Sequence, residues 1–259
     1  MPADILLRAD GVSRHFGGLV AVDGVSLALV RNEVHAVIGT NGAGKSTLIN
    51  VLAGELPASG GRVHLLGRDV TRWPQPRRAR AGLGRSYQRT TIFPRASVFE
   101  NCRLAAQAHS QHALDWWSDA KTCGESTKLA SRAIEQAGLA AQTHRIAGTL
   151  SHGQKRQLEI AMCLATAPAV LLLDEPLAGM GPEETDRMLQ LLSTLKPAHA
   201  ILLVEHDMDA VFRIADHITV MVNGAVLASG EPSAIRANAD VQSAYLGEAP
   251  ESSAAVAAV

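Results

Sequence analysis

Short apolar runs alternate with glycine-containing breaks through the first part of the chain. Runs of this length between turn residues are typical of β-strands. The pattern predicts three strands, over Ile5–Arg8, Val12–Phe16 and Val25–Val30. The breaks that separate them contain Gly11, Gly17, Gly18 and Gly24.

A further apolar run, Val34–Ile38, leads into a glycine-rich turn and then into a helical stretch. We expect this helix over Lys45–Ala53 with Gly54 at its end, because glycine readily adopts the backbone conformation that closes a helix. Residues 63–89 return to strand and loop patterns, which Pro74 and Pro76 break.

The second half of the chain changes from helical patterns to an alternation of helices and strands. From about Val98 to Leu139 the sequence is alanine-rich and helical in character, without a strand signal. We interpret residues 95–165 as a helical insert that includes an apolar helical face within Ser151–Thr166. Strands and helices then alternate through Val170–Leu173, Pro182–Leu195, Ala200–Val204, Met208–Ala215 and Ile218–Val222. This alternation predicts an α/β fold, with a mostly parallel sheet and helices on both of its faces.

The composition fits one globular domain with a buried core. Of the 259 residues, 47% are hydrophobic and 3% aromatic, so aliphatic side chains must fill the core. Aliphatic strands of this kind are typical of buried parallel sheets. We expect a single domain over residues 4–247 and a disordered tail over residues 248–259, where small side chains prevail. The net charge of -1 disfavours a dedicated nucleic-acid-binding protein, and we expect no nucleic-acid partner.

Several features favour a cytosolic protein without a membrane span. Cys102, Cys123 and Cys163 lie far apart in the sequence, which argues against a disulfide framework or a zinc site. The first residues lack the basic and apolar regions of a signal peptide. The longest apolar runs are far shorter than the roughly 20 residues that a membrane-spanning helix needs. A role at a membrane would therefore require docking onto an embedded partner.

The glycine-rich turn carries the strongest chemical signal in the chain. It matches the whole phosphate-loop pattern G-x-x-x-x-G-K-[ST] with Gly39, Thr40, Asn41, Gly42, Ala43, Gly44, Lys45 and Ser46, and Thr47 follows. Glycines let backbone N–H groups converge on phosphate oxygens, and the following helix adds its positive N-terminal end. We expect Lys45 to bind the β- and γ-phosphates and Ser46 to bind Mg²⁺. The loop alone predicts a nucleoside triphosphate, but not the reaction.

Two carboxylates follow the apolar run that begins at Val170. Asp174, at the carboxyl end of this predicted strand, is a candidate ligand of Mg²⁺, either directly or through water. Glu175 is a candidate to polarise the water molecule that attacks the γ-phosphate. An ordinary acidic turn is the alternative interpretation, but the phosphate loop upstream favours the functional one.

Two polar residues are further candidates for the same site. His206 comes shortly after the run Ala200–Val204, and parallel strands bring their carboxyl ends to one edge of a sheet, where ligands bind. We therefore expect His206 to contact the γ-phosphate and to help position the attacking water. Gln88 is a candidate to complete the Mg²⁺ or water shell, although glutamine is also a frequent surface residue.

The segment Leu150-Ser-His-Gly-Gln154 indicates the family that these residues resemble. It is similar to the LSGGQ signature of ABC ATPases, and the other motifs of that family lie in the expected order between about Leu6 and Gly247. The resemblance implies an ABC ATPase cassette: a P-loop NTPase core, an N-terminal antiparallel β subdomain and an α-helical insert. It further implies ATP hydrolysis with Mg²⁺, and stacking of the adenine on Phe16, for which packing in the core is the alternative.

The signature implies a site that a second subunit completes. Ser151, the N–H group of Gly153 and Gln154 lie at the start of a predicted helix whose positive end suits a γ-phosphate. In this family the signature lies far from the phosphate loop of the same chain. The resemblance therefore implies a head-to-tail dimer with two ATP molecules between its subunits, and both a homodimer and a heterodimer with a related chain are open.

The sequence departs from the family pattern at several positions. His152 stands in place of the first glycine of the signature pair, and Thr40 stands where proline is commoner in the phosphate loop. Leu177-Ala-Gly-Met180 replaces the usual Ser-Ala-Leu-Asp, which puts in doubt the contact across the dimer made by that aspartate. Phe16 replaces the commoner tyrosine, but stacking requires only the face of a ring.

Finer resemblance concerns the type of transporter. The segments Arg14–Asp23, Leu177–Met180, Glu205–Met208 and Ala244–Gly247 look like those of the ATP-binding subunits of branched-chain amino acid importers, a group that also serves urea and short amides. The resemblance implies membrane permease subunits as partners and, indirectly, a periplasmic solute-binding protein. It also implies a location on the inner face of the cell membrane.

The resemblance gives the helical insert a role in docking onto the permease. Thr91, Ile92, Phe93 and Pro94, within residues 89–100, are candidates for that contact. Trp116 and Trp117 are further candidates, because exposed aromatic side chains mark interfaces. Adjacent residues of a helix point in different directions, so at most one of them would face the partner, and packing inside the insert is the alternative.

Two other classes of protein fit the sequence less well. A soluble ABC ATPase that acts on nucleic acid or the ribosome usually has two cassettes or a long coiled-coil insertion, whereas this chain has one phosphate loop and one signature. A nucleotide kinase would need an acceptor site and a lid, and the segment Leu150–Gln154 would have no role in it. We therefore expect the ATPase subunit of a branched-chain amino acid importer, with an importer of urea or short amides as the alternative.

Overall fold

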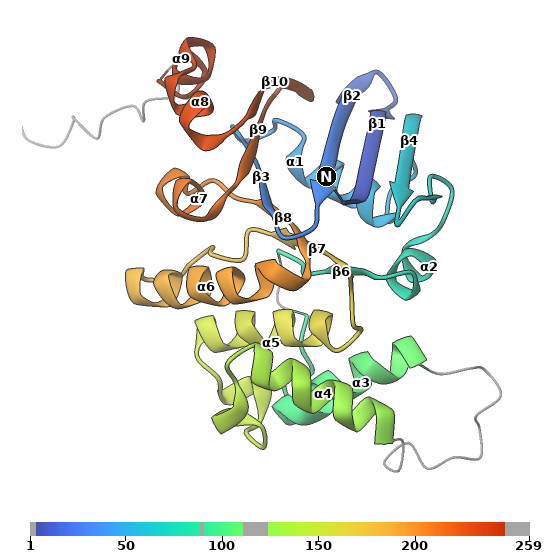
Figure 1. Ribbon diagram of the computed structural model, residues 1–259, viewed down its shortest axis with the longest axis vertical. Coiled ribbons are helices and arrows are strands. Elements are labelled where there is room, and N and C mark those ends of the chain that lie inside the picture. The colour runs from blue at the N-terminus through green and yellow to red at the C-terminus, as the bar shows by residue number, and fades with distance from the viewer. Residues whose placement is uncertain (1–3, 89–90, 111–123, 247–259) are drawn as a thin grey trace, which may run out of the picture.

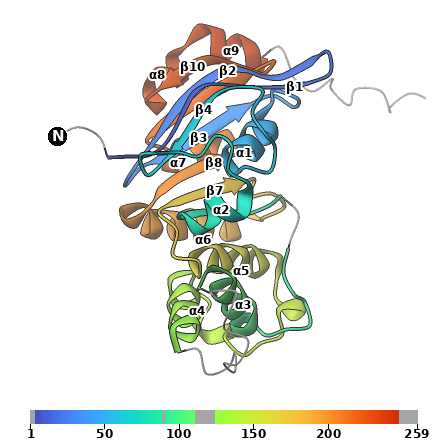
Figure 2. The same cartoon turned by 90° about the vertical axis from the view of Figure 1, so that its right-hand side faces the viewer.

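The computed structural model describes residues 4–88, 91–110 and 124–246. Two β-sheets lie against each other, and a group of helices extends from one end of the molecule (Figures 1 and 2). The tail predicted over residues 248–259 and the candidates Trp116 and Trp117 lie outside the described residues.

The first sheet is antiparallel, with strands in the order β2-β1-β4-β5. The strands are β1 (Ile5–Phe16), β2 (Leu19–Val30), β4 (Gly60–Leu65) and β5 (Arg68–Asp69). The predicted breaks at Gly11 and Gly24 are wrong, because β1 and β2 both continue through them and their pairing shifts register between Ala9 and Val12. Gly11 and Gly24 have φ angles of 56° and 59°, so these glycines bend the strands without ending them.

The second sheet has the strand order β10-β9-β3-β8-β7-β6. Its strands are β3 (Val34–Gly39), β6 (Leu83–Arg85), β7 (Val170–Asp174), β8 (Ala200–Val204), β9 (His217–Val222) and β10 (Ala225–Gly230). All neighbours from β9 to β6 pair in parallel, and β10 is antiparallel to β9. The predicted mostly parallel sheet is confirmed. Every residue of β3, β7 and β8 is buried, which explains their unbroken apolar sequences.

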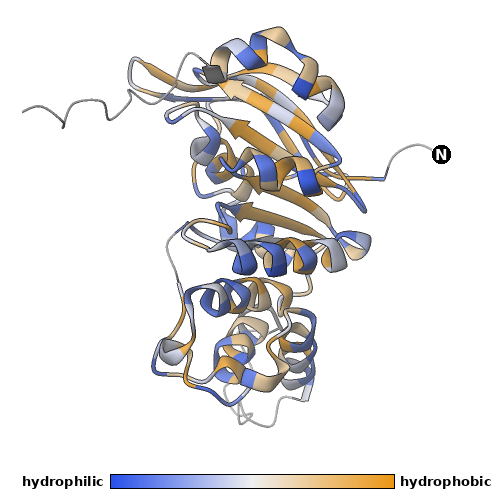
Figure 3. Ribbon diagram, turned by 90° about the vertical axis from the view of Figure 1, so that its left-hand side faces the viewer, coloured by the Kyte–Doolittle hydropathy of each residue, from blue (hydrophilic) through white to orange (hydrophobic). Residues whose placement is uncertain are grey.

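Helices cover both faces of the parallel sheet. α1 (Lys45–Ala53) has the predicted bounds and packs between this sheet and the antiparallel one. The other face is covered by α6 (Pro182–Leu195), α7 (Met208–Ile214), α8 (Pro232–Ala237) and α9 (Ala239–Leu246), and η3 (Lys196–Ala198) directly follows α6. Residues of β3 alternate between the two layers: Val37 packs toward α1, whereas Ala36 and Ile38 pack toward α7. Figure 3 shows the apolar strands between these helices.

One helix was not predicted from the sequence, because two prolines indicated only a break in the strand and loop pattern. α2 (Gln75–Arg80) begins directly after Pro74, and Pro76 lies in its first turn. A proline there costs no hydrogen bond, because the first N–H groups of a helix have no partner within it. The prediction that Pro76 breaks the pattern is therefore wrong.

The predicted helical insert is present. α3 (Val98–Ser110), α4 (Gly124–Gln136) and α5 (His152–Leu164) pack together, with η1 (Ala140–Gln142) and η2 (Ala147–Thr149) between α4 and α5 (Figure 2). One apolar cluster joins these helices to α6 and to the nearby face of β7 and β8. Within the described ranges, none of the helices has both the length and the apolar character needed to cross a bilayer.

Candidate functional site

The carboxyl end of β3 turns into the phosphate loop, which α1 follows. Gly39, Gly42 and Gly44 have φ angles of 155°, 81° and 95°. A Cβ atom on Gly44 would lie 2.2 Å from the carbonyl oxygen of Ala21, so a larger residue does not fit. Gly44 directly precedes α1, which places the first N–H groups of the helix at the loop. The loop therefore has the backbone of an anion-binding site.

Lys45 is the first residue of α1 and is buried. Its Nζ donates hydrogen bonds to the carbonyl oxygens of Gly39 at 2.5 Å and Thr40 at 2.9 Å. The ammonium group is thus held against the loop by neutral acceptors. Phosphate oxygens are stronger acceptors because they are charged, so a triphosphate in the loop would bind this group more strongly.

The loop borders an open cleft of about 540 Å³. The cleft is lined by residues of the phosphate loop, by Gln88 and Glu175, and by Phe16, Leu19, Val20, Ala21 and Asn223. Phe16 is 42% exposed, so its alternative interpretation as a core residue is wrong. The guanidinium of Arg14 lies 4.5 Å from the ring centroid of Phe16. Apolar side chains of β1 and β2 thus form the part of the cleft that adjoins the phosphate loop.

Asp174 is the last residue of β7, and its side chain is buried. Burial raises the pKa of its carboxyl group, while the positive charges of Arg85 and Lys45 oppose that shift. Nη2 of Arg85 lies 4.0 Å from Oδ2, whereas Oδ1 has no hydrogen-bond partner among the described residues. An unpartnered buried carboxylate oxygen is costly, and a divalent cation would satisfy it. Together with the hydroxyl of Ser46, this oxygen makes a donor set that fits Mg²⁺.

Glu175 has a φ angle of 49°, which is uncommon for a residue other than glycine. Its N–H group donates to the carbonyl oxygen of Val204 at 2.9 Å, which ties it to the end of β8. Its Oε2 accepts a 2.8 Å hydrogen bond from Nε2 of Gln88. Unusual backbone conformations that the surroundings enforce concentrate at functional sites. The fold thus brings together the two side chains predicted to handle the attacking water.

His206 lies after β8, at the same edge of the sheet as Glu175. Its side chain is exposed and is not among those that line the cleft, so its contact with a γ-phosphate stays a prediction. The preceding residue, Glu205, is fully buried and was missed by the sequence patterns. Its carboxylate accepts hydrogen bonds from the N–H groups of Leu177 at 2.8 Å and His206 at 3.3 Å. Burial raises the pKa of Glu205 to about 7.

The signature forms the start of α5. Oγ of Ser151 accepts a hydrogen bond from the N–H of Gln154 at 3.2 Å, and the Gln154 side chain accepts one from the N–H of Ser151 at 3.1 Å. Glu184 on α6 also reaches this point. Its Oε1 accepts hydrogen bonds from the N–H of Gly153 at 3.3 Å and from the hydroxyl of Ser151 at 3.4 Å. A carboxylate of the same chain therefore occupies the positive end of α5.

His152, which replaces a glycine of the signature, contacts the segment after Glu175. Its Nε2 lies 3.0 Å from the carbonyl oxygen of Ala178, within hydrogen-bond distance. The ring also lies close to Gly179, where an added Cβ would be 3.3 Å from Nε2. The larger residue is thus accommodated, and it connects the signature to Leu177–Met180, the segment that departs from the family pattern.

The signature and the phosphate loop line different cavities. Ser151, Gly153 and Gln154 line a cavity of about 240 Å³, together with Met180, Glu184 and Arg187. Within the described part of the chain, none of the residues lining this cavity lines the cleft at the phosphate loop. This separation agrees with the family arrangement, in which the two motifs of one chain lie apart.

Several charged residues at the site had no clear sequence signal. Arg85 forms an ion pair of 2.8 Å with Glu55 and lies near Asp174. In the sequence it is a single charge in a short strand, which does not indicate a role at the site. Arg156 and Glu159 are buried on α5 and bond to the backbone around Gln88. Charges three residues apart on a helix usually indicate an exposed face, so their burial was not predictable.

Models of two known protein families match parts of this chain. A family model described as "ABC transporter" matches residues 22–178, which include the phosphate loop, the signature and Glu175. The chain belongs to the ABC transporter family. A second model, described as "Branched-chain amino acid ATP-binding cassette transporter", matches residues 225–251. The site described above is thus that of an ATP-hydrolysing transporter subunit.

Relatives of known name cover nearly the whole chain. A high-affinity branched-chain amino acid transport ATP-binding protein, BraF of Pseudomonas aeruginosa, is 40% identical over 251 residues, with 94% of this chain and 98% of BraF covered. LivG of Salmonella typhimurium, which carries the same description, is 41% identical over 253 residues, with 94% and 98% covered.

Solved structures confirm the predicted ABC ATPase cassette. A nucleotide-free ATP-binding cassette from an ABC transporter superposes with a TM-score of 0.84 at 31% identity, covering 94% of this chain and 100% of the other. The ADP conformation of such a cassette also gives a TM-score of 0.84 at 31% identity, covering 94% and 99%.

Proposed function

We propose that this chain is the ATP-hydrolysing subunit of an importer for branched-chain amino acids, bound at the inner face of the cell membrane. The observation that carries the proposal is the meeting of the phosphate loop, Gln88 and Glu175 in one cleft. The names of BraF and LivG, at about 40% identity over nearly the whole chain, support the choice of substrate.

In this proposal the phosphate loop and Lys45 hold the triphosphate, and Phe16 stacks on the adenine. Asp174 and Ser46, with Gln88, would hold Mg²⁺, which when bound neutralises charge on the phosphate oxygens. Glu175 polarises the attacking water, Gln88 holds the Glu175 carboxylate in place, and His206 approaches the γ-phosphate. The strained backbone of Glu175 supports this role because it fixes the direction of the carboxylate.

The proposed active unit is a head-to-tail dimer, either of two copies of this chain or with a related one. Ser151, Gly153 and Gln154 would meet the γ-phosphate held by the other subunit. The separate cavities of the signature and the phosphate loop support this arrangement, because one chain does not bring the two motifs to the same cavity within its described residues. Closure of such a dimer on ATP and its opening after hydrolysis would drive transport.

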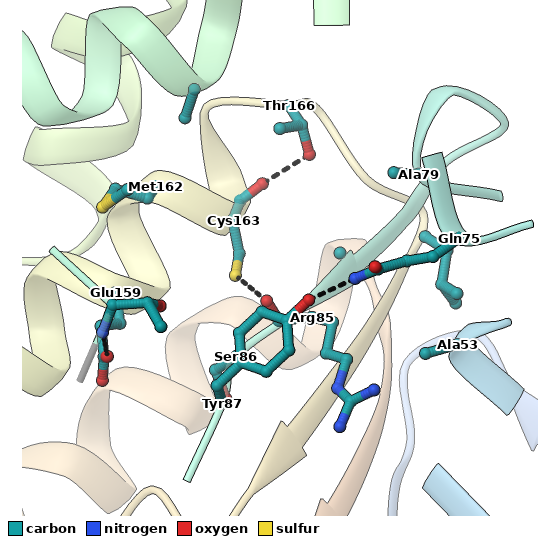
Figure 4. A pocket seen from close by; sticks show the side chains of 14 residues that line it. Ala53, Gln75, Ala79, Arg85, Ser86, Tyr87, Glu159, Met162, Cys163 and Thr166 are labelled. Carbon is teal, nitrogen blue, oxygen red and sulfur yellow. Dashed lines mark hydrogen bonds between the residues drawn. The ribbon is translucent and has the colours of Figure 1, made fainter. Parts of the chain in front are cut away.

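The proposed docking surface for the permease is the junction between the sheet and the helical insert. A cavity of about 240 Å³ lies there, lined by residues that include Gln75 of α2, Tyr87 after β6 and Met162 of α5 (Figure 4). Phe93 is exposed and follows Thr91, a lining residue of this cavity, by two positions, and Asn101 holds its backbone through hydrogen bonds of 2.7 Å and 3.1 Å. This apolar cavity, together with the exposed aromatic side chain of the segment that borders it, fits a helix of a membrane partner.

Two experiments test the proposal. Uptake of labelled leucine in a strain that lacks this gene should be lost and should return on complementation, whereas loss of urea uptake alone would favour the urea and amide alternative. Phe93→Asp should abolish co-purification with the permease but keep ATP binding. Wild-type leucine uptake in the deletion strain would refute the assigned substrate, and co-purification of the Phe93 variant would refute the assigned surface.

A further inference from the structure

A buried ion pair lies on α5, within about one and a half turns after the signature. Nη1 of Arg156 lies 2.9 Å from Oε2 of Glu159, and both side chains are almost completely buried. The two residues are three apart on the helix, so both side chains lie on one face. This face points to the chain segment that contains Gln88.

The pair holds that segment on both sides of Gln88. Arg156 donates from Nη1 to the carbonyl oxygen of Tyr87 at 2.9 Å and from Nη2 to that of Gln88 at 2.6 Å. Oε1 of Glu159 accepts a 2.7 Å hydrogen bond from the N–H of Thr91. The flanks of Gln88 are thus attached to α5 by charge-assisted hydrogen bonds, which are shorter and stronger than neutral ones.

Stability alone does not explain a buried pair of this kind. Removing two charges from water costs much of the energy that their attraction returns, and well-packed apolar side chains of similar volume are often as stabilising. Charged side chains add orientation instead, because the donors of a guanidinium group and the acceptors of a carboxylate form good hydrogen bonds in only a few relative orientations. The pair therefore specifies where the backbone around Gln88 lies relative to α5.

The same helix carries the signature at its first turn. Ser151 is the residue that caps α5, and the backbone hydrogen bonds of the helix make Ser151 and Arg156 parts of one rigid element. The backbone of Gln88 is bonded to Arg156, and its side chain donates a 2.8 Å hydrogen bond to Glu175. Gln88 thus connects the signature helix, through its backbone, to the carboxylate of Glu175, through its side chain.

We propose that Arg156 and Glu159 are positioning residues that fix the backbone around Gln88 to the signature helix, and so set where the Gln88 side chain meets Glu175. The proposal rests on the proposed function for the roles of Gln88 and Glu175. Glu159 and Thr91 also line the cavity of Figure 4, where we place the permease. A helix bound in that cavity would therefore press on the same residues that hold Gln88.

The test uses variants that separate positioning from folding. Arg156→Gln leaves the Glu159 carboxylate buried without its cation and is expected to be unstable. The double variant Arg156→Met/Glu159→Leu removes both charges and keeps the volume, and it should fold with a melting temperature close to that of the wild type. Arg156→Lys keeps the charge but not the fork. Arg132→Gln on the exposed surface of α4 is the control for loss of an arginine.

Two readouts are measured on the full chain. Hydrogen exchange of a peptide that covers residues 85–93, without nucleotide, reports whether the pair holds the segment. Steady-state kinetics with Mg-ATP report the chemical step. In the double variant we expect faster exchange in this peptide, kcat lower by about 10-fold to 100-fold, and an ATP Kd near that of the wild type. Arg156→Lys should recover part of kcat, and Arg132→Gln should match the wild type.

A double variant that folds, and that keeps both the wild-type kcat and the wild-type exchange rate, would overturn the proposal. A fall in kcat that comes with a lower melting temperature, and that Arg156→Lys does not recover, would also overturn it. That result would indicate a purely structural pair. The exchange readout does not depend on ATP. If the wild-type chain with its partners failed to turn over ATP, the proposed function would fall, while the exchange data would still decide whether the pair holds the Gln88 segment.

Discussion

Nε2 of Gln88 donates a 2.8 Å hydrogen bond to Oε2 of Glu175, although 87 positions separate them in the sequence. Gln88 follows β6 and Glu175 follows β7, which are parallel neighbours at the edge of the sheet. Parallel pairing brings their carboxyl ends to the same side. The bond orients the Glu175 carboxylate, which we propose activates the attacking water, and this geometry leads to a first prediction.

Glu175→Gln should bind ATP almost normally and hydrolyse it very slowly. The amide keeps the size of the side chain but cannot accept a proton from water, so we expect kcat to fall by about 10²-fold to 10⁴-fold. The variant should accumulate as an ATP-bound dimer, measurable by light scattering after size-exclusion chromatography. The control is Glu135→Gln, which changes an exposed residue of α4. Wild-type turnover in Glu175→Gln would show that another group activates the water.

Lys45→Ala should weaken nucleotide binding. The ammonium group is held at the phosphate loop by the carbonyl oxygens of Gly39 and Thr40, and alanine removes the one positive side chain that the loop itself supplies. Hydrogen bonds to charged groups contribute about 1.5–3 kcal/mol, so the Kd for Mg-ATP should rise by roughly 10-fold to 100-fold. Calorimetry measures this, with Lys128→Ala on the surface of α4 as the control. An unchanged Kd would contradict the assignment of the loop as the triphosphate site.

Glu184→Ala should promote dimer formation on ATP. Its carboxylate accepts hydrogen bonds from Gly153 and Ser151, at the place where the proposed dimer requires a γ-phosphate. In the Glu175→Gln background, its removal should lower the ATP concentration at half-dimerisation by about 10-fold, because these donors no longer need to exchange partners. Glu183→Ala alters the neighbouring exposed carboxylate and serves as the control. A higher ATP requirement in Glu184→Ala would show that Glu184 assists the signature instead of competing with phosphate.

His35 should make the fold sensitive to acid. Its ring is buried on β3, with Nε2 2.8 Å from Oγ1 of Thr219, and burial together with the nearby His217 lowers its pKa to about 4. The unfolded chain, with a histidine pKa of about 6.5, binds the proton more readily, so stability falls as the pH drops from about 6.5 to about 4. The difference in pKa corresponds to about 3 kcal/mol.

Urea unfolding at about pH 7.5 and about pH 5 measures this loss. His35→Gln keeps a polar side chain that can bond to Thr219 and has no charge to gain, so its stability should depend less on pH. His144→Gln, at an exposed position, should behave like the wild type. Equal pH dependence in His35→Gln and in the wild type would assign the acid sensitivity to other groups.

Glu205 should have the opposite pH dependence. Burial raises its pKa to about 7, above that of an unfolded glutamate, so the folded chain holds this proton more tightly. The stability that this proton contributes is complete below about pH 4.5 and is lost as the pH rises through about 7. Glu205→Gln cannot lose a proton, so its stability relative to the wild type should rise by about 3 kcal/mol over this range. Urea unfolding of both proteins across the range checks this, and a constant difference would show that folding does not shift the pKa of Glu205.

The sequence was most informative where a function is built from consecutive residues. The phosphate loop is formed by neighbouring backbone groups, so its glycines, lysine and serine specify its shape without help from the rest of the chain. The signature is a capped helix start, which is also local. The apolar runs of β3, β7 and β8 indicated a parallel sheet because only strands buried on both faces can be apolar throughout.

Other features were decided only by the tertiary structure. Whether Gly11 ends or bends a strand depends on the pairing of β1 with β2, and whether Arg156 and Glu159 are buried depends on what packs against α5. The bonds of Gln88 to Glu175 and of Glu184 to Gly153 join segments that are distant in sequence. A local pattern reports the preferences of neighbouring residues. The fold alone determines which distant backbone and carboxylate groups face each other, because its topology brings the ends of separate elements to one edge of the sheet.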